Sequence, residues 1–139
     1  MPATPEARAK THAFARVLGP FLVIVPGIIA VRAPELGLYI APFFGNPALV
    51  WVTGALMLFG GLFVIAQHQY WSSVAAVLIS LFGWFLALRG LALLAVPQLY
   101  AEASEGAMGA LTLVRLGFGA VFAAGLWLTY TGWIAKAPR

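Results

Sequence analysis

The sequence has no cysteine and few charged residues. Among 139 residues there are four Asp or Glu and eight Lys or Arg, so charged residues make up 9% of the chain. Without cysteine the chain can form no disulfide, thiolate metal site or thiol nucleophile. Hydrophobic residues make up 63%, and a soluble domain of this size could not bury so much apolar surface. The composition therefore argues against an ordinary soluble protein.

Motifs of enzymes and metal sites are also absent from the sequence. It contains no glycine-rich phosphate loop, no hydrolase nucleophile elbow and no paired catalytic carboxylates. The two histidines, His12 and His68, have no third ligand nearby in the sequence, so no metal or haem site is predicted. We therefore expect a protein that is not an enzyme and has no resident cofactor.

What the chain does contain is four long apolar runs, separated by short joints. A helix needs about 20 mainly apolar residues to cross a hydrocarbon core of ~30 Å. Continuous apolar runs favour helices over the alternating strands of a barrel. We predict an all-α integral membrane four-helix bundle, with residues 1–139 forming one transmembrane domain in the lipid bilayer. The predicted spans are residues 13–31, 47–66, 73–96 and 110–134.

Prolines mark the first run and the loop after it. Pro20 and Pro26 interrupt the first run, which predicts a bent helix. They also favour retention of the run as a span over removal as a signal peptide. The loop of residues 32–46 is too apolar to lie free in water, and its Pro and Gly exclude a long helix. We expect an interfacial segment there.

Basic residues gather near the two ends of the chain. An even number of spans brings both termini to one side of the membrane, and the positive-inside tendency places that side in the cytoplasm. The net charge is +4, but no basic and aromatic residues alternate as nucleic-acid binding requires. Lipid headgroups are the expected anionic partner, and no nucleic acid is expected. The basic residues near the ends are Arg8, Lys10, Arg16, Lys136 and Arg139.

Arg89 and Arg115 are the charged residues set deepest in the predicted runs. Each lies about 12 Å or less from the outer end of its helix, at a rise of ~1.5 Å per residue. Glu102 and Glu105 lie between them and share one face of a helical turn. We predict that the glutamates fold over the arginines as intramembrane ion pairs. The alternatives are arginines that reach to headgroups, or an anion site.

No Asp or Glu lies inside any predicted span. Proton- or cation-coupled carriers commonly keep a buried carboxylate as the coupling site, so a small multidrug exporter is not favoured. The third and fourth runs each carry a stripe of small residues, and such stripes let helices approach closely in lipid. We predict that these two runs pack on each other as an antiparallel hairpin. The stripes are Gly83, Ala87 and Gly90, and Gly117, Ala120 and Ala124.

The second joint and the third run carry a recognisable pattern. It resembles a widespread group of uncharacterised four-helix bacterial inner-membrane proteins, whose middle region reads H-N-x-W, then G-W, then K-G, then P. This chain has Gln69 where asparagine is usual and Arg89 where lysine is usual. The resemblance implies a multi-pass protein of the bacterial inner (plasma) membrane and carries no activity. The matching residues are His68, Trp71, Gly83, Trp84, Gly90 and Pro97.

Within this pattern, His68 and Trp71 form an interface motif at the membrane surface. The predicted function is that of a non-enzymatic membrane protein, an accessory, scaffold or assembly subunit of a homo-oligomer or of a larger membrane complex. The alternative is a small homo-oligomeric transporter or channel in which Arg89 and Arg115 attract an anionic ligand.

Overall fold

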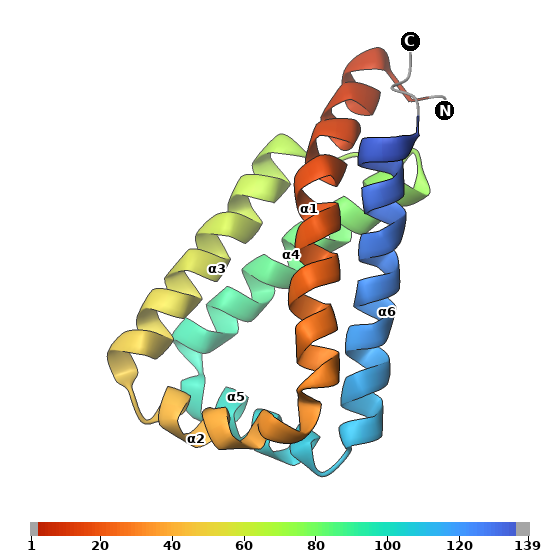
Figure 1. Cartoon of the computed structure of the whole chain (residues 1–139). Helices are drawn as coiled ribbons and strands as arrows, with labels where there is room; N and C mark the ends of the chain where they lie inside the picture. Colours follow the sequence, from red (N-terminus) through yellow and green to blue (C-terminus); the bar gives the residue numbers. More distant parts are fainter. Residues whose placement is uncertain (1–2, 136–139) are drawn as a thin grey trace.

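The computed structural model describes residues 3–135 and contains only helices there (Figure 1). Four helices are long and apolar enough to cross a membrane. All four predicted runs are thus confirmed as helices, and their ends agree within one residue except at the start of the first. The long helices are α1 (Pro5–Val31), α3 (Pro47–Gln67), α4 (Val74–Ala95) and α6 (Leu111–Thr129), the last continued by the π-helical turn η2 (Tyr130–Ile134).

Helix α1 begins well before its apolar run because the polar leader is itself helical. Thr4 is the N-cap, and its Oγ1 accepts a hydrogen bond of 3.2 Å from the backbone N of Ala7. Pro5 occupies the first helical position and Glu6 lies in the first turn. A capping threonine, an early proline and an early acid all favour a helix start. The helix then continues through Pro20 and Pro26.

Two short helices replace the loops at the end of the molecule away from the chain termini. The interfacial segment expected at residues 32–46 is mostly helical, and the acidic loop is a twelve-residue helix. Pro97 occupies the first turn of that helix, a position that proline favours. The two short helices are α2 (Gly37–Phe44) and α5 (Pro97–Met108), and the 3-10 turn η1 (Ala33–Glu35) precedes α2.

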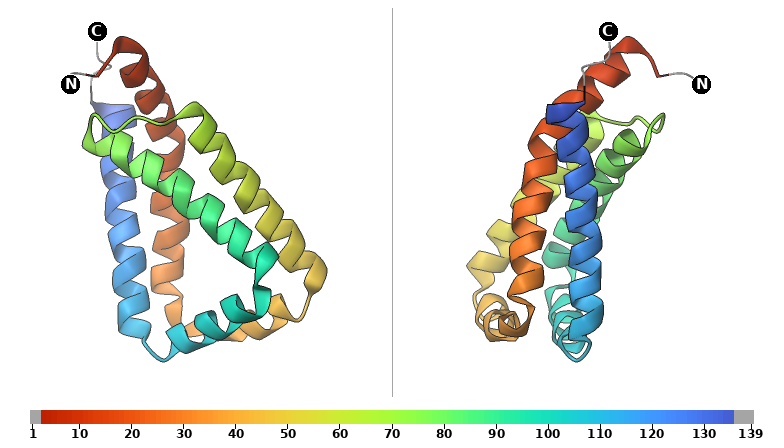
Figure 2. Two further views of the ribbon diagram at one scale, coloured as in Figure 1. Left: turned by 180° about the vertical axis from the view of Figure 1, so that it is seen from behind. Right: turned by 45° about the vertical axis from the view of Figure 1, so that its right-hand side comes forward.

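The four long helices form two antiparallel hairpins. Helix α3 packs along α4, and α1 packs along α6 and η2. The hairpins meet near the chain termini and separate toward the other end, where α2 and α5 lie side by side across the gap (Figures 1 and 2). We call these two ends of the molecule the termini end and the α2–α5 end. The two hairpins therefore form a wedge that is widest at the α2–α5 end.

The predicted hairpin between the third and fourth runs is wrong. The stripe of α4 packs on α3, where a Cβ on Gly83 would lie 2.7 Å from Cγ1 of Val64. A Cβ on Gly117 of α6 would meet nothing within 4 Å. The physical reason is the connection: a short joint folds α4 back on α3, whereas α5 crosses the open end and carries α6 to α1.

Helices α1 and α6 approach each other at glycines that lie outside the predicted stripe. A Cβ on Gly125 would lie 2.7 Å from the backbone of Leu22, and one on Gly132 would lie 2.6 Å from the backbone N of Arg16. The buried apolar core lies where the two hairpins meet. Its fully or largely buried members are Ala15, Leu22, Val64, Ala75, Ile79 and Leu128.

Candidate functional site

A cavity of about 420 Å³ lies at the α2–α5 end, between the two hairpins. We call it the wedge cavity. Every helix from α1 to α6 contributes to its wall. The wall is mostly apolar, and among the residues that the structure describes Arg89 of α4 is the one charged residue in it. Other residues in the wall include Tyr39, Phe44, Thr53, Tyr100, Ser104 and Phe118.

The Arg89 guanidinium lies between aromatic rings but lacks a full set of acceptors. Its central carbon lies 5.6 Å from the ring centroid of Tyr100 and 5.9 Å from that of Phe85. Aromatic faces attract a cation, but they accept no ordinary hydrogen bond from it. The Nε atom of Arg89 is buried and has no hydrogen-bond partner among the described residues. Burying an N–H donor without a partner costs about 1–3 kcal/mol.

Arg89 lies six residues before the end of α4 at Ala95, which places it ~9 Å inside the helix end. The guanidinium group of arginine keeps its positive charge in proteins. The wedge cavity therefore contains a permanent positive charge in an apolar wall. This arrangement suits a ligand that brings its own negative charge.

The predicted ion pairs between the glutamates and the arginines are not formed. Glu102 and Glu105 are exposed on α5, and neither lies within 4.0 Å of a basic group in the part of the chain that the structure describes. Arg115 is exposed on α6 and does not line the wedge cavity. Of the four residues, only Arg89 is at the cavity.

The length of α5 explains why the glutamates lie away from Arg89. Tyr100, Ser104 and Ala107 of α5 line the wedge cavity, and their spacing of four and three residues defines one face of a helix. Glu102 and Glu105 fall between these positions, on other faces. A single acidic turn could have folded over the arginines, but a twelve-residue helix turns its apolar face inward.

His68 is the centre of a buried polar network at the termini end. Its side chain is 0% exposed. Nδ1 lies 3.1 Å from Oγ of Ser80 on α4, and Nε2 lies 2.9 Å from Oγ1 of Thr11 on α1. Oγ of Ser80 also lies 3.0 Å from the carbonyl oxygen of Tyr70, to which it can donate. The network joins both hairpins to the joint between α3 and α4.

The surroundings of His68 favour its neutral form. The ring of Phe14 lies 5.4 Å from that of His68, edge to face. Burial lowers the pKa of His68, and the positive charge of Lys10 lowers it further, against an opposing effect of the residue's own backbone carbonyl. The neutral imidazole is therefore the favoured form at neutral pH.

The predicted interface motif is thus divided between two environments. Trp71 is 52% exposed in the joint, as an aromatic residue at a membrane surface would be. His68 instead lies inside the protein. Sequence reasoning missed its partners Thr11 and Ser80, although a serine within an apolar run is a signal for a buried hydrogen bond.

The residues that the structure describes form no cluster of metal ligands. In residues 3–135 no group of three or more His, Asp or Glu side chains lies close enough together to hold a metal ion. His68 uses both ring nitrogens in the network, with Thr11 and Ser80 as its partners. The wedge cavity is accordingly the arrangement with the clearest capacity to bind a ligand.

The resemblance of residues 68–97 to four-helix bacterial membrane proteins is still a prediction, and it carries no activity in any case. Comparisons of the chain with models of known protein families, with curated proteins and with solved structures find no match.

Proposed function

We propose that this protein binds an amphiphilic anion inside the membrane, in the wedge cavity, with Arg89 as the positive partner. The observation that carries the proposal is the buried Nε of Arg89, which has no acceptor among the described residues. A carboxylate or phosphate can accept from Nε and a terminal nitrogen of arginine together. The remaining wall is apolar and suits a hydrocarbon body.

The positive charge of Arg89 and the apolar wall of the wedge cavity together define the ligand class. One cation in a wall of aromatic and aliphatic side chains favours one anionic group joined to an apolar chain. A volume of about 420 Å³ falls within the ~300–1,000 Å³ of ordinary small-molecule sites. A polar metabolite would leave most of its hydrogen-bonding groups unpaired against this wall.

Titration of the purified full chain with laurate and with dodecyl phosphate tests the proposal. Native mass spectrometry in a neutral detergent measures the bound fraction for each probe. Arg89→Gln should weaken binding by about tenfold or more, since a hydrogen bond to a charged group contributes ~1.5–3 kcal/mol. Arg89→Lys keeps the charge and should retain part of the affinity.

Arg115→Gln is the matched control, because it removes an arginine that is exposed and outside the wedge cavity. Equal binding by wild type and Arg89→Gln would refute the proposal. Equal weakening by Arg89→Gln and Arg115→Gln would also refute it, because it would indicate general charge attraction. Flux of the same probes in proteoliposomes, with and without Arg89, separates a binding protein from a transporter or channel.

A second candidate function is that of an accessory, scaffold or assembly subunit in a homo-oligomer or larger complex. The observation that favours it is the face of α6 at Gly117, where an added Cβ would meet nothing within 4 Å. Small residues let a further helix approach closely in lipid. Gly117→Leu should reduce co-purification of a partner from native membranes. If wild type and Gly117→Leu were both recovered as lone monomers, this result would count against this function.

We also propose that the chain resides in a bacterial inner membrane with both termini in the cytoplasm. Arg8, Lys10 and Arg16 near the start of the chain support this orientation. The resemblance described above supports the bacterial membrane. Labels at the two ends of the chain, tested for access from each side of sealed vesicles, check the orientation.

A further inference from the structure

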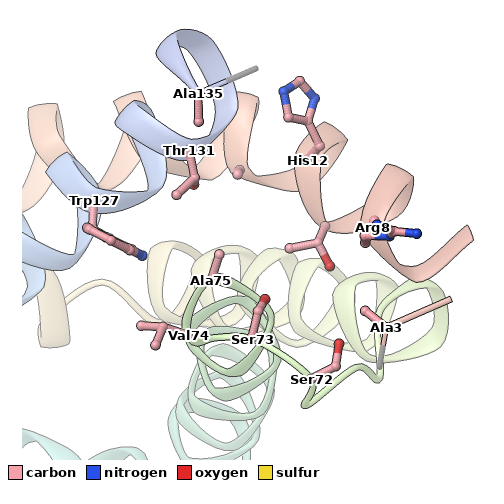
Figure 3. Close-up of a pocket in the computed structure, with 12 residues that line it drawn as sticks. Ala3, Arg8, His12, Ser72, Ser73, Val74, Ala75, Trp127, Thr131 and Ala135 are labelled. Atoms are coloured by element: carbon pink, nitrogen blue, oxygen red, sulfur yellow. The ribbon is translucent and has the colours of Figure 1, made fainter. Parts of the chain in front are cut away.

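A second cavity, of about 400 Å³, lies at the termini end of the molecule. It is bounded by the start of α1, the joint before α4 and the end of α6 (Figure 3). We call it the termini-end cavity. It is separate from the wedge cavity, because no residue lines both.

Most of the wall of this cavity is apolar, and α1 contributes basic and polar residues to it. Arg8, Thr11, His12 and Ala15 line it, and their spacing of three, one and three residues places them on one helix face. Figure 3 shows Arg8 at the rim, and the ring of His12 points away from Ser72 and Ser73. Among residues 3–135, no acidic residue lines the wall.

Arg8 differs from its neighbour Lys10 in having no ion-pair partner within 4.0 Å in residues 3–135. Lys10 does not line the cavity, and its Nζ lies 3.1 Å from Oε1 of Glu6. Within residues 3–135 the charge of Arg8 therefore has no acidic partner, whereas that of Lys10 is paired with Glu6. Arg8 supplies the attraction for an anion at the rim.

The opposite side of the cavity offers hydroxyl groups. Ser72 and Ser73 belong to the joint, and Figure 3 shows their hydroxyls on the side of the cavity that faces α1. Oγ of Ser73 accepts a hydrogen bond of 3.2 Å from the backbone N of Ala76, so its O–H proton is free to donate. The N–H groups of Val74 and Ala75, at the start of α4, add further donors.

The depth of the cavity matches the headgroup region of a bilayer. Trp71 and Trp133, 52% and 59% exposed, lie at the same end of the molecule, and tryptophan concentrates at membrane–water interfaces. Trp127 gives the cavity an apolar wall beside its polar one. A ligand there can place an anionic group among donors and an apolar part against the indole.

We propose that the termini-end cavity binds the phosphate group of an anionic lipid headgroup, between Arg8 on one side and Ser72 and Ser73 on the other. Phosphate accepts several hydrogen bonds at once, and arginine meets it with paired donors. Among the described residues the site contains donors from α1 and from the joint, and no carboxylate lines it. It does not depend on the function proposed for the wedge cavity.

Native mass spectrometry of the full chain from phosphatidylcholine nanodiscs, with and without phosphatidylglycerol, tests the proposal. Arg8→Gln should weaken retention of phosphatidylglycerol by about tenfold, the scale of one charge-assisted hydrogen bond. Lys10→Gln is the matched control and should change it by less than about twofold, because that charge is already paired. Ser72→Ala should weaken retention without any change of charge.

Equal weakening by Arg8→Gln and Lys10→Gln would overturn the proposal, because it would show diffuse charge attraction. No preference for phosphatidylglycerol over phosphatidylcholine would overturn it as well. Added inorganic phosphate distinguishes the source of the group: displacement of the lipid that depends on Arg8 shows that free phosphate also binds. Arg89→Gln should leave all of these results unchanged, so failure here and failure of the wedge-cavity proposal are distinguishable.

Discussion

The replacement of Gly90 by alanine tests how the four helices are paired. Gly90 of α4 faces the backbone of α3: an added Cβ would lie 2.7 Å from the carbonyl oxygen of Gly54, and would come still closer to the backbone N of Leu58. Backbone atoms of a packed helix cannot rotate away as a flexible side chain can. The two helices would therefore have to separate to admit one methyl group.

Two opposing effects set the magnitude for Gly90→Ala. Alanine in a helix is favoured over glycine by about 0.5–1 kcal/mol. Overpacking a close contact costs about 1–3 kcal/mol, and occasionally more. Because the contact at Gly90 is with backbone, we expect the upper part of that range and a net loss of about 1–2 kcal/mol in the free energy of unfolding.

Gly117→Ala is the matched control. The same change on α6 meets nothing within 4 Å, so it should stabilise the protein by the helix-propensity gain of about 0.5–1 kcal/mol. Reversible unfolding in mixed micelles with increasing SDS, followed by tryptophan fluorescence and circular dichroism, measures both variants. The two should differ by about 2 kcal/mol and have opposite signs.

The result that would refute this reasoning is destabilisation by both substitutions. If Gly117→Ala destabilised the protein as Gly90→Ala does, both glycines would lie at a close helix contact, as they would if α4 packed on α6. That is the arrangement that the stripes of small residues predict when the sequence is considered alone. Stabilisation by both substitutions would show that neither glycine lies at a close helix contact.

Three further predictions use the same unfolding measurement. The pKa of His68 is lowered in the folded state, so the unfolded chain takes up a proton first as the pH falls below ~6.5. The free energy of unfolding should therefore be highest above that pH and should decrease as the pH drops toward the lowered pKa. His68→Gln should flatten this pH dependence, and an unchanged pH profile would contradict the buried network. Replacing Glu102 and Glu105 together by glutamine should change the free energy of unfolding by less than about 0.5 kcal/mol, since both are exposed and neither forms an ion pair within residues 3–135. A larger loss would support the predicted ion pairs. Trp133→Phe keeps a ring beneath the Arg16 guanidinium, whose carbon lies 4.6 Å from the ring centroid, but removes the 3.0 Å hydrogen bond from Nε1 to the carbonyl oxygen of Arg16. The expected loss is about 0.5–1.5 kcal/mol, and no loss would show that the bond is not formed in solution.

The position of Arg89 shows how far the sequence could identify the candidate site. An arginine within an apolar run is conspicuous, and the sequence alone identifies Arg89 as a candidate site residue. The exposure of Arg115, Glu102 and Glu105 could not be predicted, because it depends on the rotation of α5 and α6 about their own axes. A rotation of half a turn exchanges a cavity-facing side chain for an exposed one, while the sequence remains equally apolar on average.

His68 presents the opposite case. Its place in a short joint between two apolar runs predicts a residue at the membrane surface, and its neighbour Trp71 is indeed exposed. Burial of His68 depends on Thr11, which is 57 positions away in the chain. No local pattern reveals a partner at that separation.

The sequence by itself determined the number and type of the long helices, and their limits except at the start of α1. Each depends on a local property, the length of an uninterrupted apolar run against the thickness of hydrocarbon, and the ends follow from nearby caps such as Thr4 and Ser73. Only the tertiary structure decided which helices pair, where the wedge opens and which charges face a cavity. Those outcomes depend on backbone approach at single glycines, as at Gly90 and Gly125, and on the span of α5, which joins segments that are distant in the chain.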